Sequence, residues 1–357
     1  MTAPDELETA LRSIDDPVIG EDIVSLGLVE ELSIDDGVAT ITFAFNTPFS
    51  PAELEIGRRV REILDEAGLE PDLRAYVGEE HGFDEEVMPE VRNIIAVTSG
   101  KGGVGKTTIA ANLAAGLQAK GARVGLLDAD IYGPNVPRIL PTDSEIDLTA
   151  DERLLPAESD GVKLISMSYL LQNQDDPAII RGPIINQILG QFMNDVVWED
   201  LDYLIVDLPP GTGDASLNLL QTLPVNGAVI VTTPQQMAVD DTKKGLKMFQ
   251  QHEVPIVGIV ENMSGFRCPT CDDVHELFGK DGGVDISEEY GVPLVGSLPI
   301  HPDFGREGET PVAKDEASPV HETMLELVDA IADRLGEINR RTVAEHVGEV
   351  DGDEAEN

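Results

Sequence analysis

The chain has 357 residues, and its 68 acidic and 24 basic side chains give a formal net charge of −44. A surface this acidic argues against a nucleic-acid partner, because contacts to phosphates need lysine and arginine, and against docking on an anionic membrane. Hydrophobic residues make up 41% of the chain, which is enough for a folded core. The length allows one large or two ordinary domains.

The acidic residues are spread along the whole chain, and aromatic residues account for only 4% of it. This composition is typical of proteins from salt-accumulating halophiles, because molar salt shortens the Debye length to about 3 Å and screens the repulsion between carboxylates. We interpret the charge as an adaptation to a salty cytosol. A mesophilic protein with acidic tails is the alternative.

The sequence carries neither a membrane-span pattern nor an export signal. No apolar run reaches the roughly 18 residues that cross a bilayer, and the segment MTAPDELETALRSIDDP lacks the basic and apolar regions of a signal peptide. We therefore expect a cytoplasmic protein. Its two cysteines, Cys268 and Cys271, are too few for a disulfide framework in a chain of this length.

Residues 1–78 are predicted to form a small α+β domain. The β-rich run at residues 38–45 follows an Asp-Asp-Gly turn and predicts a strand. A helix start is then predicted, with Ser50 as its N-cap, Pro51 in the first turn and Glu53 closing a capping box. Four apolar residues at helical spacing predict an earlier helix: Leu7, Ala10, Leu11 and Ile14.

Two acidic segments flank a larger domain, which we place at residues 91–346. Residues 79–90 contain six acids and no lysine or arginine, which is typical of a linker. Residues 347–357 contain five acids and no base, and we expect them to form a disordered tail. The last helix is predicted at residues 318–346, with Ser318 as its cap.

Short apolar runs alternate with helical stretches in the larger domain. This alternation indicates an α/β fold with a mostly parallel sheet that helices cover on both faces. The predicted strands lie at residues 93–98, 122–127, 162–167, 203–206, 228–232, 256–260 and 294–296.

The strongest motif follows the first of these strands and matches the phosphate-binding pattern G-x-x-x-x-G-K-[ST]. Its glycines let successive backbone N–H groups surround a phosphate, and the helix that follows adds a favourable dipole. Lys106 should reach the β- and γ-phosphates, and the Thr107 hydroxyl should ligate Mg²⁺. The predicted nucleotide-binding residues of this P-loop are Gly100, Lys101, Gly102, Gly103, Val104, Gly105, Lys106, Thr107 and Thr108.

Carboxylates follow two of the other predicted strands. Asp128 and Asp130 come after the strand at residues 122–127, and Asp207 directly follows the strand at residues 203–206. An apolar strand that ends in aspartate is how P-loop enzymes place a carboxylate near Mg²⁺. These residues therefore fit the same phosphate chemistry.

Cys268 and Cys271 form a C-x-x-C pair that allows three interpretations: a redox dithiol, half of a metal site, or two thiols without a special role. A structural zinc site needs four ligands. His275 could be a third ligand, but no fourth is obvious nearby in the sequence. Two copies of the pair across a dimer axis would supply four thiolates, which suits zinc or a [4Fe–4S] cluster.

The loop K-G-G-V-G-K-T-T resembles the deviant Walker A motif of the MinD/Mrp group of P-loop ATPases. Residues 93–300 as a whole resemble the Mrp/ApbC iron–sulfur cluster carrier ATPases, and the acidic composition is similar to that of haloarchaeal proteins. The supporting segments are residues 128–137 (DADIYGPNVP), Arg181-Gly182-Pro183, residues 207–214 (DLPPGTGD), residues 233–236 (TPQQ), and the cysteine pair followed by Phe278-Gly279.

The resemblance implies a nucleotide-sandwich homodimer in which Lys101 reaches the nucleotide of the partner subunit. It also implies roles for the three aspartates. Asp130 orients the attacking water, Asp128 supports the shell of the metal, and Asp207 holds Mg²⁺ through a water molecule. Gly211 would be the hinge of the second switch segment.

Further assignments also come from the resemblance. Asn262 corresponds to the position that reads adenine, residues 296–303 close the base pocket, and Arg181 serves the dimer interface or the nucleotide. Cys268 and Cys271 of each subunit bridge one labile [4Fe–4S] cluster. The implied function is that of a slow ATPase that carries this cluster to apo iron–sulfur proteins, in contact with cluster assembly factors.

The N-terminal unit resembles the small SufT-like domain that is linked to metal–sulfur cluster assembly, on Asp16-Pro17 and on residues 23–29 (IVSLGLV). Stand-alone relatives often have a cysteine where this chain has Ser50. Serine is a poor ligand for soft metals. We therefore expect residues 1–78 to dock or position partners without ligating a cluster.

Two other functions are weighed against the cluster carrier. A positioning ATPase like MinD or ParA would need a basic lipid-binding helix or a basic DNA-binding face, whereas this chain is acidic throughout and has a C-x-x-C pair that neither function requires. A P-loop ATPase regulated by zinc or by redox chemistry differs only in what the thiolates hold.

Overall fold

The computed structural model divides into two compact units. The first comprises residues 1–83 together with 332–357, and the second comprises residues 84–331. The structure describes residues 4–75, 88, 90–130, 133–142, 146–170, 188, 190–268, 270, 271, 273–305 and 311–355. Most of the predicted linker at residues 79–90 lies outside the described residues.

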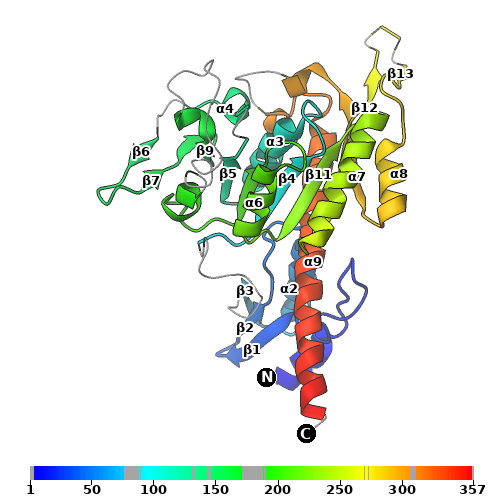
Figure 1. Cartoon of the computed structure of the whole chain (residues 1–357). Helices are drawn as coiled ribbons and strands as arrows, with labels where there is room; N and C mark the ends of the chain where they lie inside the picture. The colour runs from blue at the N-terminus through cyan, green and yellow to red at the C-terminus, as the bar shows by residue number, and fades with distance from the viewer. Residues whose placement is uncertain are drawn as a thin grey trace. The chain divides into compact units, whose positions relative to one another are not determined.

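The first unit contains a three-stranded sheet in the order β1-β2-β3 (Figure 1). Strands β1 (Val29–Asp35) and β2 (Val38–Phe43) pair antiparallel across a tight turn, in which Asp36 and Gly37 both have positive φ angles. Strand β3 (Glu70–Ala75) returns parallel to β2 after a helix. The predicted strand and turn are confirmed. Strands β1 and β3 were not predicted, because charged residues interrupt their apolar alternation.

Two helices pack on this sheet, α1 (Pro4–Leu11) and α2 (Pro51–Glu66). Ser50 is the N-cap of α2, as predicted, and its hydroxyl accepts the Glu53 backbone N–H at 3.4 Å. The predicted role of the Glu53 side chain in a capping box is wrong. Its carboxyl group contacts Arg340, because a buried guanidinium requires acidic partners.

Helix α9 (His321–Ala355) belongs to both units, since the boundary falls between residues 331 and 332. It continues past residue 346, across most of the segment that we expected to form a disordered tail. No proline interrupts this segment, and extending an existing helix is far easier than nucleating one. Acidic composition alone was therefore a poor signal for the end of the helix.

Arg340 on α9 is fully buried inside the first unit. Its Nε lies 2.6 Å from Asp16 Oδ2, and its Nη1 lies 3.3 Å from Glu53 Oε1. Burial raises the pKa of Glu53 to about 8, although Arg340 opposes the rise. Asp16 makes the shorter of the two contacts to the guanidinium. Residues far apart in the sequence thus complete one core, which differs from the boundary predicted at residue 78.

The second unit is built on a sheet of nine strands among the described residues, in the order β13-β12-β11-β4-β10-β5-β9-β8, with β14 paired to β12. Pairing is parallel except for β8 and β13 at the edges. All seven predicted strands are confirmed. The strands are β4 (Ile94–Ser99), β5 (Val124–Asp128), β8 (Ala157–Ser159), β9 (Val162–Ser166), β10 (Tyr203–Asp207), β11 (Gly227–Thr232), β12 (Ile256–Arg267), β13 (Val274–His275) and β14 (Leu294–Ile300).

Helices cover the central strands of this sheet. Alternate residues of β4 such as Ala96 pack in one core with Leu246 and Phe249 of α7, which runs along β11 (Figure 1). The intervening residues Ile95 and Val97 are equally buried, and α3 contacts β4, β5 and β10. The helices are α3 (Lys106–Ala119), α4 (Val136–Ile139), α6 (Asp214–Thr222), α7 (Gln236–Gln251) and α8 (Gly282–Tyr290).

A short hairpin of β6 (Asp147–Leu148) and β7 (Leu154–Leu155) lies apart from the large sheet. Three 3-10 helices complete the described elements, at Met167–Leu170, Pro302–Gly305 and Val312–Lys314. In the part of the chain that the structure describes, none of the helices combines the length and apolar character needed to span a bilayer.

The buried Arg340 generates a stability prediction. Replacing Arg340 with alanine leaves Asp16 buried without its cation, so the free energy of unfolding of the first unit should fall by about 3–5 kcal/mol. Hydrogen exchange of the β2 amides reports this unit directly. Arg341→Ala is the matched control, because Arg341 is exposed and its pair with Glu337 should contribute about 1 kcal/mol or less. Equal losses in the two variants would contradict the prediction.

Candidate functional site

The turn between β4 and α3 is shaped by its glycines. Gly103 and Gly105 have φ angles of 81° and 90°, which residues with side chains rarely adopt. Gly100 is confined by its surroundings, because a Cβ atom there would lie 2.4 Å from the backbone carbonyl carbon of Asp241. The turn leads directly into the N-terminus of α3, where backbone N–H groups and the helix dipole favour an anion.

A cavity of about 320 Å³ lies against this turn. Its lining comes from the P-loop, from Asp130 after β5, from α4 and the residue before it, and from two later loops. The P-loop and its glycines thus line a hollow large enough to take up a small ligand. The lining residues are Ser99, Gly102, Gly103, Gly105, Lys106, Thr107, Thr108, Asp130, Asn135, Arg138, Ile139, Pro210 and Phe304.

Lys106, Thr107 and Asp207 form a polar cluster at the cavity. Lys106 Nζ lies 2.5 Å from Asp207 Oδ1, and the Thr107 hydroxyl donates to Asp207 Oδ2 at 2.7 Å. Burial raises the pKa of the Asp207 carboxyl, while Lys106 and Thr107 oppose the rise. Lys106 Nζ also lies 4.0 Å from Asp130 Oδ2. The structure therefore brings together the predicted phosphate-binding, Mg²⁺-binding and water-orienting residues.

Asp128 is fully buried and holds two loops in place. Its carboxylate accepts hydrogen bonds from the backbone N–H of Val136 at 3.1 Å, the hydroxyl of Ser166 at 2.9 Å and the backbone N–H of Asp130 at 3.3 Å. Burial raises the pKa of Asp128 to about 7, and the charge of Asp207 adds to the rise. Asp128 does not line the cavity, so its direct effect is to position Asp130, which does.

Lys101 is not among the residues that line the cavity of its own chain, although Gly102 and Gly103 are. Its Nζ donates a hydrogen bond of 3.2 Å to Oε1 of Gln235, the residue that precedes α7. Lys101 therefore contacts the residue before α7, whereas Lys106 lines the cavity. This placement is compatible with the predicted action of Lys101 on the nucleotide of a second subunit.

Asn262 of β12 contacts the P-loop beside Gly105, the glycine that precedes α3. Its Nδ2 donates to the carbonyl of Val104 at 2.9 Å, and its Oδ1 accepts the Met263 N–H at 2.9 Å. A Cβ atom on Gly105 would lie 2.2 Å from that Nδ2 atom. In this structure Asn262 therefore supports the loop, and the prediction that it reads adenine stays a prediction.

Gly211 and Phe304 come from later segments of the chain that also lie at the P-loop or the cavity. Gly211 has a φ angle of 87°, and its N–H donates to the Ser99 carbonyl at 2.7 Å, which ties the predicted switch segment to the P-loop strand. Phe304 lines the cavity from the 3-10 helix after β14, one residue beyond the segment predicted to close the base pocket.

Sequence reasoning did not assign Asn135, Arg138 or Phe304 to the site. Asn135 lies within a segment that carried the family resemblance, and Arg138 follows that segment by one residue. A basic side chain so close to a loop containing two aspartates was a usable signal for an anion site. Residues 131 and 132 of the same segment, and the whole of Arg181-Gly182-Pro183, lie outside the described residues.

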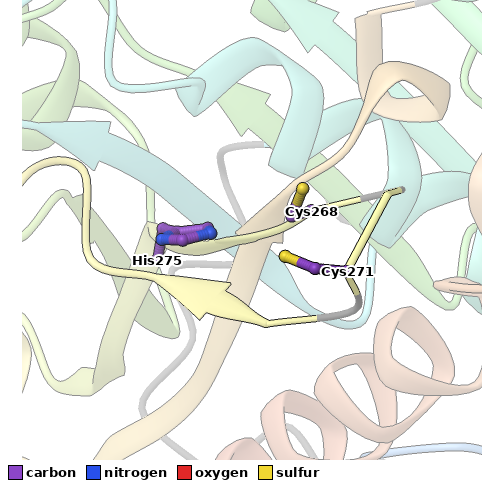
Figure 2. A group of neighbouring side chains, drawn as sticks. All are labelled: Cys268, Cys271 and His275. Atoms are coloured by element: carbon purple, nitrogen blue, oxygen red, sulfur yellow. The ribbon is translucent and has the colours of Figure 1, made fainter.

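Cys268 and Cys271 lie at the end of a hairpin formed by β12 and β13. The antiparallel register places Phe266 opposite His275. The Cys268 N–H donates to the Asp273 carbonyl at 2.9 Å, which closes the loop between the strands. Figure 2 shows the two cysteine side chains and His275 gathered at this end of the hairpin.

The donor atoms of Cys268, Cys271 and His275 all lie within 4.8 Å of one another. Cys268 is partly buried, whereas the other two are exposed. Backbone N–H groups of Thr270 and Cys271 lower the pKa of the Cys268 thiol, which favours the nucleophilic and metal-binding thiolate. Among the residues that the structure describes, this group contains three donors, so one chain supplies an incomplete tetrahedral site.

Comparison with known families identifies the family of a chain that combines this P-loop with the cysteine pair. Residues 90–332 match the family described as NUBPL iron-transfer P-loop NTPase, and residues 4–69 match the family described as iron–sulfur cluster assembly protein. The chain belongs to the NUBPL iron-transfer P-loop NTPase family. It is therefore a P-loop ATPase of the iron–sulfur cluster carrier group, as the sequence predicts.

Curated relatives match along nearly the whole chain. The iron–sulfur cluster carrier protein of Synechocystis is 43% identical over 310 residues, which cover 84% of this chain and 88% of the relative. The protein of the same name from Deinococcus radiodurans is 38% identical over 344 residues, which cover 96% and 97%. The second alignment includes the N-terminal unit as well as the ATPase unit.

Solved structures agree with the fold. A nucleotide-binding protein from Archaeoglobus fulgidus, solved in complex with ADP, is 33% identical with a TM-score of 0.55, and the match covers 70% of this chain and 90% of that one. A McdA–ATP complex from Cyanothece has a TM-score of 0.50 at 15% identity and supports the fold alone. The match covers 68% of this chain and 96% of that one.

The close approach at Gly100 leads to a prediction for nucleotide binding. A methyl group in Gly100→Ala must push the P-loop away from the backbone of α7, and such overpacking costs about 1–3 kcal/mol. We expect ADP affinity, measured by titration calorimetry, to fall roughly 5- to 150-fold. Gly245→Ala is the control, because Gly245 lies in α7 and has open space around its Cβ position. Unchanged affinity in Gly100→Ala would contradict the expectation.

Proposed function

We propose that this protein binds Mg²⁺–ATP at the P-loop cavity and carries a [4Fe–4S] cluster, held by Cys268 and Cys271 of two subunits, to apo iron–sulfur proteins. The observation that carries the proposal is the cysteine pair, with Cys268 partly buried and Cys271 exposed, on a hairpin that extends strand β12, which itself contacts the P-loop. Family membership supports this assignment over a positioning ATPase. The cluster is cargo, so an accessible site suits both loading and release.

The chain supplies suitable residues for the nucleotide. Lys106 is placed to bind the β- and γ-phosphates, since it lines the cavity beside the N-terminus of α3. Thr107 and Asp207 present two hard oxygen donors in mutual contact, which fits Mg²⁺, and we assign the ion to them. When bound, Mg²⁺ supplies positive charge that neutralises the phosphates.

Asp130 is the residue that we assign to orienting the attacking water. It lines the cavity, and its carboxylate is held by the Gly133 N–H at 3.3 Å and by proximity to Lys106. Asp128 fixes the backbone of Asp130 and acts as a positioning residue. Lys101 then stabilises the phosphates from the partner subunit, because in its own chain it contacts Gln235.

The thiolates of the hairpin suit an iron–sulfur cargo. Such clusters are held by four thiolates, and two subunits supply four. Arrangement around a two-fold axis also explains why one chain contains only two cysteines. Exposed Val274 and Leu277 next to the pair provide apolar surface for contact with the second subunit or an apoprotein.

The N-terminal unit contributes docking in this proposal. Ser50, where relatives often have a cysteine, is fully buried, caps α2 and donates to Asp333 Oδ1 at 2.7 Å. Its hydroxyl is therefore committed to structure and is a poor ligand for iron. We assign contact with cluster assembly factors to this unit, which matches a cluster assembly family over residues 4–69.

The trans action of Lys101 predicts complementation between two inactive variants. Lys101→Ala and Asp130→Ala should each lose ATP turnover. In a mixed dimer one site combines the intact Asp130 of one chain with the Lys101 of the other. Random mixing should therefore restore about one quarter of wild-type turnover, since half of the dimers carry one intact site of two. A mixture that stays inactive would show that Lys101 acts within its own chain.

Cluster loading gives a separate prediction. Anaerobic reconstitution with iron and sulfide should give about half a [4Fe–4S] cluster per chain, measured by visible absorption and iron content. Cys268→Ala and Cys271→Ala should each abolish the absorption, because a dimer of either variant retains only two thiolates. Lys280→Ala, an exposed residue beyond the hairpin, is the control. A stable cluster in either cysteine variant would overturn the cluster assignment.

A further inference from the structure

The cysteine hairpin contains a third donor that the two-subunit cluster does not require. Four thiolates already complete a cluster, yet His275 lies within 4.8 Å of both sulfur atoms in a single chain. The proposed function assigns no role to the imidazole of His275.

The geometry of the hairpin explains why His275 is near the cysteines. Phe266 pairs with His275 and Cys268 faces Asp273 across the closing hydrogen bond, so Cys268 and His275 are diagonal neighbours. Diagonal neighbours on one face of an antiparallel pair are within reach of long side chains. Cys271 approaches the same point from the loop (Figure 2). Strand pairing therefore places His275 on the same face as Cys268, and the loop brings Cys271 to the same point.

We propose that Cys268, Cys271 and His275 of one chain form a site for a single divalent transition-metal ion, of the Zn²⁺ or Fe²⁺ class, which is occupied when no cluster is shared between subunits. Two thiolates and an imidazole suit such ions and disfavour Mg²⁺ and Ca²⁺, which require oxygen ligands. The two thiolates neutralise the charge of the ion. The fourth position stays open to water or to an incoming ligand.

The donor atoms need only a small adjustment to hold an ion. Donors on one tetrahedral zinc ion lie about 3.5–3.8 Å apart, given bonds of about 2.3 Å to sulfur and 2.0 Å to nitrogen. The three atoms here lie within 4.8 Å. Cys271 and His275 are exposed, so rotation of their side chains can close the difference without moving the strands. This inference shares the cysteines with the proposed function and differs from it in stoichiometry and in the use of His275.

Cobalt provides the direct test, since Co²⁺ binds like Zn²⁺ and its thiolate complexes absorb visible light. Metal-free, reduced full-length protein is titrated anaerobically with CoCl₂. We expect thiolate-to-cobalt absorption that saturates at one ion per chain, because each chain has its own site. His275→Ala should weaken Co²⁺ binding by at least about tenfold, since even the loss of a residue that only supports a metal ligand costs about 10- to 100-fold.

A matched control and a second readout separate the two metal-binding modes. His252→Ala removes an exposed histidine at the end of α7 and should bind Co²⁺ like the wild type. His275→Ala should still reconstitute about half a [4Fe–4S] cluster per chain, because the four thiolates of two subunits remain.

The outcomes distinguish this inference from the proposed function. Saturation at one Co²⁺ per two chains, or wild-type Co²⁺ affinity in His275→Ala, would overturn the single-ion site and leave the cluster assignment intact. Loss of the cluster in His275→Ala together with wild-type Co²⁺ affinity would show that the histidine serves the cluster and would overturn the single-ion role. Failure of wild-type protein to take up a cluster, with Co²⁺ bound at one per chain, would overturn the proposed function and support this site.

Discussion

The parallel pairing of β10 between β4 and β5 is the constraint on which the nucleotide site depends. In that register Asp207 lies beside Val97 of one neighbour and Asp128 of the other. The P-loop follows β4, so three chemically active segments meet at the carboxyl edge of the sheet, where α/β folds place their ligands. Asp207 is fully buried there, and a buried carboxylate requires a partner. Lys106 and Thr107 meet that requirement, which also places them at the cavity.

Strand β12 connects this site to the cysteines within the second unit. Asn262 donates to the carbonyl of Val104, and Cys268 lies five residues after Met263 on the same segment. Between these points the pairing register with β14 shifts, and Met263 has a φ angle of 58°. A residue other than glycine is strained at positive φ, and it keeps this conformation only where the surrounding structure holds it. One continuous strand with a local irregularity therefore contacts the P-loop at Asn262 and leads to the cysteine pair.

The first unit depends on the C-terminal helix of the chain. Arg340 of α9 is buried against Asp16 and Glu53, and Asp333 accepts hydrogen bonds from the Ser50 hydroxyl and the Ala52 N–H. These contacts join the two ends of the sequence in one core. They also engage the Ser50 hydroxyl on both sides, because it donates to Asp333 and accepts the Glu53 N–H as the cap of α2. The docking role that we propose for this unit thus rests on a core that includes α9.

The features that follow from local sequence pattern could be predicted before the fold was known. Glycine spacing predicted the P-loop, and apolar runs ending in aspartate predicted Asp128 and Asp207, because short-range geometry imposes these spacings. The C-x-x-C pair allowed three interpretations, and the family resemblance chose the metal site among them. Contacts between segments far apart in the sequence became known from the fold. Strand register set His275 beside the cysteines, Asn262 met the P-loop across the sheet, and Arg340 entered the N-terminal core. No local pattern encodes these contacts, since each depends on how strands pair and helices pack after the chain has folded.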